Sequence, residues 1–485
     1  MSAHDRGKLH FSAKENWLND PNGMVYFEGE YHLFFQHHPH GMTHGPMYWG
    51  HAVSRDLTEW EELDIALFPD EHGMIFSGSA VVDWNDTTGF FGGEPGLVAI
   101  FTHHLEREGQ PALQTQSLAY SKDRGRTWTK YAGNPVLKHD DYIDFRDPKV
   151  LWHEPTSRWV MAVACGDTVC FYASPDLKEW TFGSEFGDGI GSHDGVWECP
   201  DLFELAVDGD PARSRWVLLV SIGDAPAVEE GSRTQYFTGF FDGASFVPDA
   251  ASQAVRWLDG GRDNYAGVTW SDVPKEDGRR LLIGWMSNWK YANLTPTEGF
   301  RGAMTLPREL ALASTPSGDT LVQRPARELE RALVPLLELA DAPLAAAAEA
   351  LAALRLDICL IRAVLPAQSS FVLEVRKGAA ETTEIGFDAK LGQLYVDRTR
   401  SGRSGFHPQF AGRHAVAAEP ADGRIELDIW VDRTSVEVFA CGGQAVLTDL
   451  IYPSPGSDGF SLSSEDPELQ LPSLRVFALE LPGRG

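Results

Sequence analysis

Cysteine is scarce in this chain. Only five cysteines occur among 485 residues, and no two of them have the close spacing of metal-binding or redox motifs. An odd number of scattered cysteines does not form a disulfide framework, so we expect free, buried thiols in a protein of a reducing compartment. These cysteines are Cys165, Cys170, Cys199, Cys359 and Cys441.

Positive charge is also scarce. Lys and Arg number 41 against 70 Asp and Glu, which gives a formal net charge of −29 and argues against nucleic acid or an anionic membrane surface as a partner. No apolar run reaches the roughly 20 residues that span a membrane. The segment Met1–His10 lacks the apolar core of a signal peptide. We therefore expect a cytoplasmic protein, or an extracellular one only if a leader has been removed.

Helical periodicity is nearly absent from residue 10 to about residue 310. Short β-branched and aromatic runs alternate there with Gly, Asp and Asn turns, as in an all-β domain. A Ser-x-Asp turn followed by a tryptophan recurs at Ser54–Trp60, Ser121–Trp128 and Ser174–Trp180. A repeat of ~50–70 residues suits one four-stranded sheet per unit and about five units, which predicts a β-propeller with a central funnel. The alternative is chance similarity among β-hairpins, because only three copies are clear.

The pattern changes after residue 320. We expect residues 321–353 to form a partly helical linker, because residues 343–353 are rich in alanine and leucine. Alternation of apolar and polar residues returns over 354–485 and predicts a C-terminal β-sandwich behind a propeller domain at 1–320. The sandwich strands are expected at 354–364, 370–375, 393–396, 425–431, 435–439 and 474–481.

Three short motifs each place a carboxylate beside a proline. The first is Trp-Leu-Asn-Asp-Pro-Asn-Gly at 17–23, the second Phe-Arg-Asp-Pro at 145–148 and the third Trp-Glu-Cys-Pro-Asp at 197–201. A lone Asp-Pro is typical of a tight turn. Three such carboxylates together indicate glycoside hydrolysis, which uses a pair of carboxyl groups across the scissile bond.

In this order the three motifs resemble the signature set of glycoside hydrolase family 32, the invertases, inulinases and levanases. The resemblance covers nearly the whole chain and implies a five-bladed propeller followed by a sandwich. It implies that Asp20 is the nucleophile and that Glu198 is the general acid and base. By the same resemblance Asp147 binds fructose hydroxyls and stabilises the transition state, while Arg146 keeps Asp147 ionised. We expect hydrogen bonds from Asn19 to keep Asp20 ionised as well.

Further positions match substrate-binding residues of that family. Gln36 follows a strand close to the predicted nucleophile, and Phe76 and Ser77 lie in a Phe-Ser-Gly-Ser motif. For Trp49 a place in the core is an equal alternative. The full set of expected substrate-binding residues is Asn19, Gln36, His44, Trp49, Phe76, Ser77, Arg146, Asp263, Tyr265 and Trp285.

The chain departs from the family pattern in two places. His44 stands where fructan-cleaving members have a tryptophan against the sugar, and an imidazole offers less stacking area but can donate a hydrogen bond. Gly260 and Asn264 replace two aromatics, so we expect a more open or more polar pocket wall. Several histidines cluster near residues 37–51. Their spacing around Pro39 does not suit a metal site, and retaining hydrolysis needs no metal or other cofactor.

The expected function is release of terminal fructose from sucrose, inulin or levan by a retaining, exo-acting hydrolase. A transfructosylase with the same covalent intermediate is the alternative, since the motifs do not separate water from a sugar as acceptor. A propeller that only binds carbohydrate is a third alternative, disfavoured because all three carboxylates are present. The sandwich could brace the propeller, bind sugar or form a homodimer contact.

Overall fold

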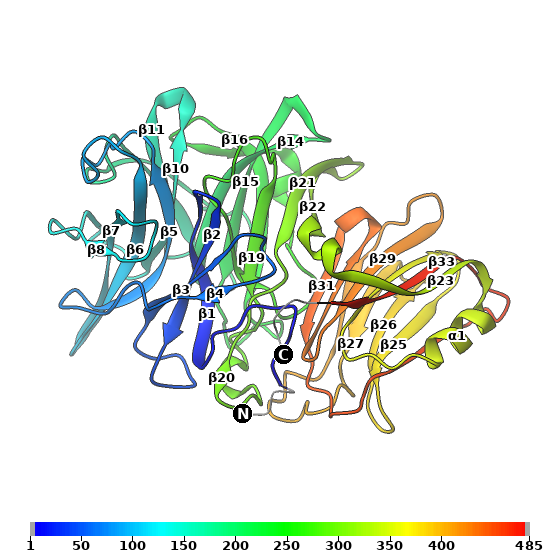
Figure 1. Cartoon of the computed structure of the whole chain (residues 1–485). Helices are drawn as coiled ribbons and strands as arrows, with labels where there is room; N and C mark the ends of the chain where they lie inside the picture. The colour runs from blue at the N-terminus through cyan, green and yellow to red at the C-terminus, as the bar shows by residue number, and fades with distance from the viewer. Residues whose placement is uncertain (1–4, 481–485) are drawn as a thin grey trace.

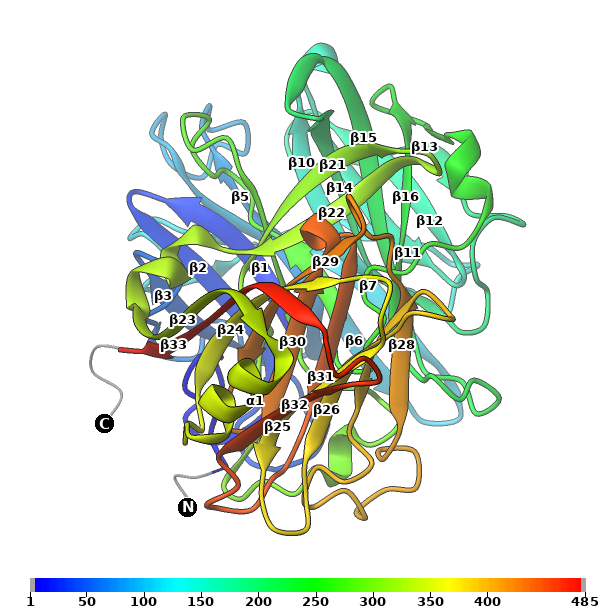
Figure 2. The ribbon, with the colours of Figure 1, turned by 90° about the vertical axis from the view of Figure 1, so that its right-hand side faces the viewer.

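The computed structural model describes residues 5–480 and consists almost entirely of β-strands in two domains. Figure 1 shows the larger, N-terminal domain in blue to green beside the smaller, C-terminal one in yellow to red. Viewed from the side of the C-terminal domain, that domain lies in front of the larger one (Figure 2).

The N-terminal domain is built of consecutive antiparallel sheets, each traced from an inner strand outwards. The first sheet contains β1 (Asn16–Phe27), β2 (Glu30–His38), β3 (Tyr48–Ser54) and β4 (Glu61–Glu62), with β20 (Phe300–Arg301) parallel to β1. The second contains β5 (Met74–Asp83), β6 (Gly96–Arg107), β7 (Gln110–Ser121), β8 (Thr129–Lys130) and β9 (Leu137–Lys138). The third contains β10 (Phe145–His153), β11 (Arg158–Cys165), β12 (Thr168–Ser174) and β13 (Thr181–Phe186).

Two further four-stranded units complete this domain. The fourth contains β14 (Trp197–Val207), β15 (Asp210–Ile222), β16 (Arg233–Phe241) and β17 (Phe246–Pro248). The fifth contains β18 (Tyr265–Thr269), β19 (Arg280–Trp285), β21 (Arg308–Thr315) and β22 (Gly318–Pro325). One pairing between Val207 and Leu312 joins these two units into a single hydrogen-bonded sheet.

The five inner strands form a ring. Strand β1 contacts β5, β5 contacts β10, β10 contacts β14, β14 contacts β18, and β18 returns to β1. The packing between neighbouring sheets is apolar. For example, Val160 and Phe171 of the third unit pack in one cluster with Leu218 of the fourth. The domain is therefore a five-bladed β-propeller, as predicted.

The Ser-x-Asp repeat occupies equivalent places in the first three blades. It follows β3, β7 and β12, the third strand of each blade, and the serine hydroxyl lies 2.8 to 3.3 Å from the aspartate. The tryptophan indole then donates to a backbone carbonyl of the same turn. The repeat thus marks the turn that leads to the outer edge of each of the first three blades, and the fourth and fifth blades lack a clear copy.

The C-terminal domain is a β-sandwich with an apolar core between two sheets. One sheet has the order β23 (Leu333–Pro343), β33 (Gln470–Leu479), β24 (Cys359–Pro366), β29 (Arg424–Val431), β30 (Ser435–Ala440) and β31 (Ala445–Leu450). The other has the order β28 (Arg413–Ala417), β27 (Gln393–Asp397), β26 (Thr383–Asp388), β25 (Phe371–Lys377) and β32 (Gly459–Ser464). All six strands predicted from the sequence are present, with ends shifted by a few residues.

The segment predicted as a linker is more regular than expected. Residues 327–332 form a short 3-10 helix, and the alanine-rich stretch forms α1 (Leu344–Ala352), as its composition predicts. Between them β23 pairs with β33 at the edge of the sandwich, a strand that sequence reasoning missed. Pairing with a neighbour overrides local preference here. The exact division of the domains at residues 320 and 353 stays a prediction.

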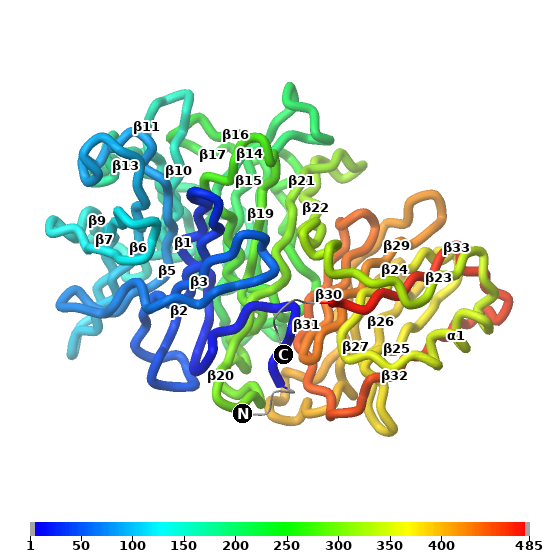
Figure 3. The backbone as a smooth tube through the Cα atoms, viewed as in Figure 1, coloured from blue at the N-terminus to red at the C-terminus, as the bar shows by residue number. Residues whose placement is uncertain are grey.

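Buried charges join the two domains. The N-terminal segment passes between them before it enters β1 (Figure 3), and the His10 ring lies 2.8 Å from both Asp432 and Glu437 of the sandwich. Burial opposes a charged ring, but hydrogen bonds to these two carboxylates outweigh it and raise the pKa of His10 to about 9. Arg308 of β21 contacts Glu437 at 2.6 Å and Asp259 at 3.1 Å.

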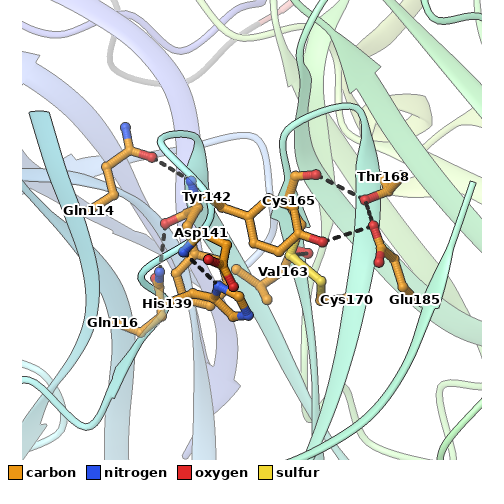
Figure 4. Close-up of a disulfide and its surroundings, with 11 residues drawn as sticks. Gln114, Gln116, His139, Asp141, Tyr142, Val163, Cys165, Thr168, Cys170 and Glu185 are labelled. Carbon is orange, nitrogen blue, oxygen red and sulfur yellow. Dashed lines mark hydrogen bonds between the residues drawn. A yellow bond between two sulfur atoms is a disulfide. The ribbon is translucent and has the colours of Figure 1, made fainter. Parts of the chain in front are cut away.

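The expectation of five free thiols is wrong. Cys165 and Cys170 form a disulfide across the β11–β12 hairpin (Figure 4), with Cα atoms 6.0 Å apart. The two residues lie diagonally opposite on the same face of adjacent strands, where side chains come within reach of each other. Spacing in the sequence did not reveal this pairing. Cys199, Cys359 and Cys441 are free and buried, as predicted.

Removing Arg308 should separate the energetics of buried and exposed ion pairs. Arg308→Ala leaves Asp259 and Glu437 buried without their cation, so we expect a loss of about 3–5 kcal/mol of unfolding free energy. The control is Arg327→Ala, whose side chain is 58% exposed and pairs with Asp277; exposed pairs contribute less than about 1 kcal/mol. Urea unfolding followed by fluorescence measures both, and equal losses would contradict the role given to Arg308.

Candidate active site

Each inner strand of the propeller is irregular at the same end. Pairing registers shift between Leu18 and Pro21 in β1, Ile75 and Gly78 in β5, Arg146 and Lys149 in β10, Glu198 and Asp201 in β14, and Tyr265 and Val268 in β18. Such bulges re-aim side chains and interrupt pairing. Pro21, Pro148 and Pro200 fall inside three of them, and proline is tolerated there because it has no N–H to give to the ladder. The predicted catalytic residues therefore come from β1, β10 and β14 and meet at one end of the propeller axis.

Asp20 is more buried than Glu198, the other member of the predicted catalytic pair, and 9% of its surface is exposed. Its carboxylate accepts hydrogen bonds from the Ser77 hydroxyl at 2.9 Å and the Asn19 amide at 3.1 Å. The Trp17 indole holds the Asn19 side chain from behind at 2.7 Å. Burial, reinforced by repulsion from Glu198, raises the pKa of Asp20 to about 6 despite these hydrogen bonds. The hydrogen bond from Asn19 acts in the predicted direction, since it favours the ionised form of Asp20, but burial outweighs it.

Asp147 has a left-handed backbone, with φ 65°, inside the bulge of β10. This conformation is costly for a residue other than glycine and is typical of functional sites. Its N–H donates to the Thr102 hydroxyl at 3.0 Å, and its carboxylate accepts from the Cys199 N–H at 3.0 Å. Burial raises the pKa of Asp147, since the attraction of Arg146 does not compensate for it.

Glu198 lies nearer to solvent than the two aspartates, with 21% of its side chain exposed against 6% for Asp147. Arg146 donates to one oxygen of Glu198 through Nη2 at 2.8 Å and Nε at 3.3 Å. The Tyr265 hydroxyl donates to the other oxygen. Arg146 was expected to pair with Asp147, but its nearest approach to that carboxylate is 4.0 Å. Its other partner is Asp144, just upstream in the same segment.

Cys199 connects the two aspartates, a role that sequence reasoning missed. Its Sγ lies 3.6 Å from Asp20 and 3.5 Å from Asp147. Burial, together with the surrounding carboxylates, raises the pKa of the Cys199 thiol well above its usual range. The protonated thiol is a weak donor that both carboxylates share. The sequence shows that Cys199 stands next to Glu198, but it does not show that β1 brings Asp20 close to Cys199.

Aromatic rings pack behind and beside the site: Trp17 and Trp285 are fully buried, whereas Trp289 is partly exposed. Trp17 packs against Trp285 and Trp289 with ring centres 5.9 and 6.0 Å apart. His44 is exposed and lies edge-on to Trp289 at 5.4 Å and near Phe76 at 6.3 Å. Partial desolvation lowers the pKa of His44 from its usual value. Trp289 was not predicted, although it follows Trp285 in the same short motif.

Gln36 and Ser77 meet through Asn22. With the Asn22 amide oriented to suit its neighbours, its oxygen accepts from the Gln36 amide at 3.0 Å and its nitrogen donates to the Ser77 hydroxyl at 3.1 Å. Ser77 in turn holds Asp20. Gln36 therefore lies beside the predicted nucleophile, where the sequence placed it.

Two expected substrate-binding residues lie elsewhere. Trp49 is buried among core residues, and its indole donates to the Phe76 carbonyl at 3.0 Å, so it supports the pocket wall from behind. Asp263 is fully buried at the domain interface, where Tyr291, the Leu450 N–H and Arg398 occupy its oxygens. The prediction that Trp49 and Asp263 bind the substrate directly is therefore wrong.

Gly260 and Asn264, which stand where the family pattern has aromatic residues, do not open the pocket. Gly260 lies against the sandwich, where an added Cβ would come within 2.8 Å of Val416. Asn264 is buried and donates to Asp259 at 3.2 Å. Both positions belong to the domain contact, so the expected change of the pocket wall is wrong.

Neither a metal cluster nor a membrane span emerges from residues 5–480. Within that range, no three His, Cys, Asp or Glu side chains gather as metal ligands, and no helix has the length and apolarity to cross a bilayer. His32 and His51 of the histidine cluster face each other at 3.0 Å inside the first blade. The absence of a cofactor stays a prediction.

A β-propeller that brings three carboxylates and an arginine together at one end of its inner strands suits glycoside hydrolysis, which uses a pair of carboxyl groups. The model of the glycosyl hydrolases family 32 N-terminal domain matches residues 10–325, and that of the family 32 C-terminal domain matches residues 345–478. The chain belongs to glycosyl hydrolase family 32.

Curated relatives and solved structures agree with this family. The chain is 49% identical over 482 residues to a levanase of Bacillus subtilis, covering 98% of this chain and 70% of that protein. It is 38% identical over 488 residues to an extracellular exo-inulinase of Aspergillus niger, covering 93% and 90%. The exo-inulinase of Aspergillus awamori superimposes with a TM-score of 0.88 at 34% identity over 98% of both chains. A β-fructofuranosidase of Schwanniomyces occidentalis complexed with fructosyl-erythritol superimposes with a TM-score of 0.85 at 30% identity over 98% of both.

Glu198→Gln should remove proton donation while it preserves the fold. We expect sucrose cleavage to slow by roughly a thousandfold or more, because an alkoxide leaving group needs the proton. Formation of the intermediate from a nitrophenyl fructoside should slow far less. Steady-state and burst kinetics on both substrates measure this, with Glu204→Gln on the exposed part of β14 as the control. Equal losses on both substrates would mean that Glu198 is not the proton donor.

The pH dependence should reflect the raised pKa of Asp20. A nucleophile must be ionised, so kcat/KM is full above this pKa and falls as pH drops through about 6, instead of near 4. Ser77→Ala removes a hydrogen bond that lowers the pKa and should move this limb to higher pH. Ser461→Ala on the sandwich is the control. An acidic limb near pH 4 that does not move in Ser77→Ala would contradict the assignment.

Proposed function

We propose that this chain is a retaining, exo-acting β-fructosidase that releases terminal fructose units from levan, inulin and sucrose. The observation that supports it most directly is the convergence of Asp20, Asp147 and Glu198 around Cys199 and Arg146. The names of the levanase and exo-inulinase relatives give the substrate class. A solved relative complexed with a fructosyl ligand supports a fructoside as the bound molecule.

Cleavage requires a nucleophile on one side of the anomeric carbon and an acid on the other. An oxygen of Asp20 forms the bond to the anomeric carbon while the bond to the leaving oxygen breaks. Glu198 gives its proton to that oxygen, and Asp147 stabilises the positive charge on the sugar. Glu198, now a carboxylate, takes a proton from a water molecule whose oxygen displaces Asp20 and releases fructose.

The depths of these groups support exo-action. Asp20 and Asp147 are nearly buried, whereas Glu198 is more exposed and therefore lies towards the leaving group. Asn19, Gln36, Ser77 and Arg146 surround the deep end and suffice for the hydroxyls of a single fructosyl unit. Because a closed pocket admits a chain end but not a chain middle, one fructose leaves per cleavage.

Several properties stay predictions. Transfructosylation with a sugar as the acceptor uses the same residues and is the alternative activity. Substrate preference depends on the outer wall, where His44 replaces the usual tryptophan. The cytoplasmic location loses one of its arguments, because Cys165 and Cys170 pair. A possible homodimer, and the absence of nucleic-acid and membrane partners, rest on the sequence alone.

Early digests of levan, inulin and sucrose should test this function. We expect fructose as the first product from each polymer, with slow shortening of the chain and no ladder of oligosaccharides. From concentrated sucrose, free fructose should equal free glucose. Chromatography of samples taken before about 5% conversion resolves these cases. Oligosaccharides as the main early products would contradict exo-action, and a deficit of fructose against glucose would favour the transferase.

A further inference from the structure

The β11–β12 hairpin carries the disulfide and is hydrogen-bonded near the starts of β10 and β14, the strands that contain Asp147 and Glu198. Its turn residue, Gly166, donates its N–H to the Asp144 carbonyl at 2.8 Å and accepts at its own carbonyl from the Trp197 N–H at 2.9 Å. Asp144 precedes the Arg146–Asp147 pair, and Trp197 immediately precedes Glu198. A single peptide turn therefore ties the start of β10 to the start of β14.

The disulfide links the two strands of this hairpin next to the turn. Cys165 stands opposite Phe145 on β10, and Cys170 stands opposite Val163, two pairs further from the turn than the Cys165–Thr168 pair. Both sulfurs are buried with about 1% of each residue exposed. Because the two cysteines flank the turn at Gly166, the bond between them limits how far the two strands of the hairpin can separate there.

Neighbouring hydrogen bonds fix the same segment from its other sides (Figure 4). The Phe145 N–H donates to Gln114 at 2.8 Å, and the Phe145 carbonyl accepts from Gln116 at 2.7 Å. The Thr168 hydroxyl donates to the Cys165 carbonyl at 2.9 Å. The hairpin turn and the entry into β10 are thus held as one unit, and Trp197 is attached to that unit through Gly166.

We propose that the Cys165–Cys170 hairpin is a positioning element that sets the spacing between Asp147 and Glu198. This inference rests on the roles given to those two residues under the proposed function. The cystine touches neither carboxylate, and it acts through the peptide groups of Asp144 and Trp197. Rate depends steeply on such spacing, since a shift of about 1 Å at a reacting group costs up to ~100-fold.

Reduction is the natural way to loosen the hairpin. Two electrons and two protons convert the cystine into two thiols, and dithiothreitol supplies them as it becomes a cyclic disulfide. The burial of both sulfurs means that reduction needs local opening of the hairpin, so mild reductant should act slowly on the folded protein.

The test compares two double variants of equal composition. Cys165→Ala/Cys170→Ala removes the disulfide, and Cys359→Ala/Cys441→Ala removes two free buried thiols of the sandwich. We expect the first to lower kcat on sucrose about tenfold, with KM within twofold and a shifted alkaline limb of the pH profile. The second should keep the wild-type kcat. Dithiothreitol should lower the kcat of the wild type to the same level, reoxidation should restore it, and neither should change the first variant.

Folding must be followed in the same samples. Circular dichroism and thermal unfolding report the folded fraction, to which kcat is normalised. An unchanged normalised kcat in the first variant, or a loss seen equally in both variants, would overturn the proposal while leaving the hydrolase function intact. A wild type that is folded but releases no fructose would instead overturn the proposed function itself.

Discussion

Three carboxylates beside a single guanidinium, two of them buried, are the constraint on which this structure depends. At an effective dielectric constant of 20, two like charges 4 Å apart repel by about 4 kcal/mol. Ser77, Asn19 and Cys199 offer hydrogen bonds to Asp20, and Arg146 compensates Glu198. These contacts do not fully offset burial, so the pKa values of Asp20 and Asp147 rise. Burial therefore favours the protonated form of these two aspartates more than water does.

The propeller gathers these groups because each of its inner strands is irregular near its start. A regular strand would alternate its side chains and direct every second one away from the axis. Bulges next to Pro21, Pro148 and Pro200 break that alternation. The strained backbone of Asp147 and of Cys199, with φ 65° and 46°, lies in the same places. The long regular parts of these strands supply the packing energy that holds such conformations.

The sandwich is connected to the active site through one loop. Residues 259–265 begin with Asp259, which meets Arg308 and the sandwich, continue through Asp263, which meets Arg398, and end at Tyr265 on Glu198. Asp432, which follows β29, and Glu437 of β30 bind His10 of the N-terminal segment. This contact therefore holds the loop whose last residue, Tyr265, donates a hydrogen bond to Glu198.

Sequence patterns predicted what is periodic or local. Alternation gave the sandwich strands, the Ser-x-Asp turn marked successive blades, and the proline motifs identified Asp20, Asp147 and Glu198. Contacts between distant strands were beyond such patterns. Neither Cys199 between two aspartates, nor the partners of Arg146, nor the burial of Asp263 against Arg398 has a local signal, because each depends on how blades and domains meet. The disulfide was missed since scattered cysteines pair only where strands bring them together.

The most direct measurement is the identity of the residue that carries the covalent fructosyl group. Glu198→Gln should accumulate this intermediate from a nitrophenyl fructoside, because the variant lacks the base that activates water. Rapid denaturation, proteolysis and mass spectrometry then locate the label. The account predicts a fructosyl ester on the peptide that contains Asp20. A label on Asp147, or burst kinetics without any covalent adduct, would contradict it.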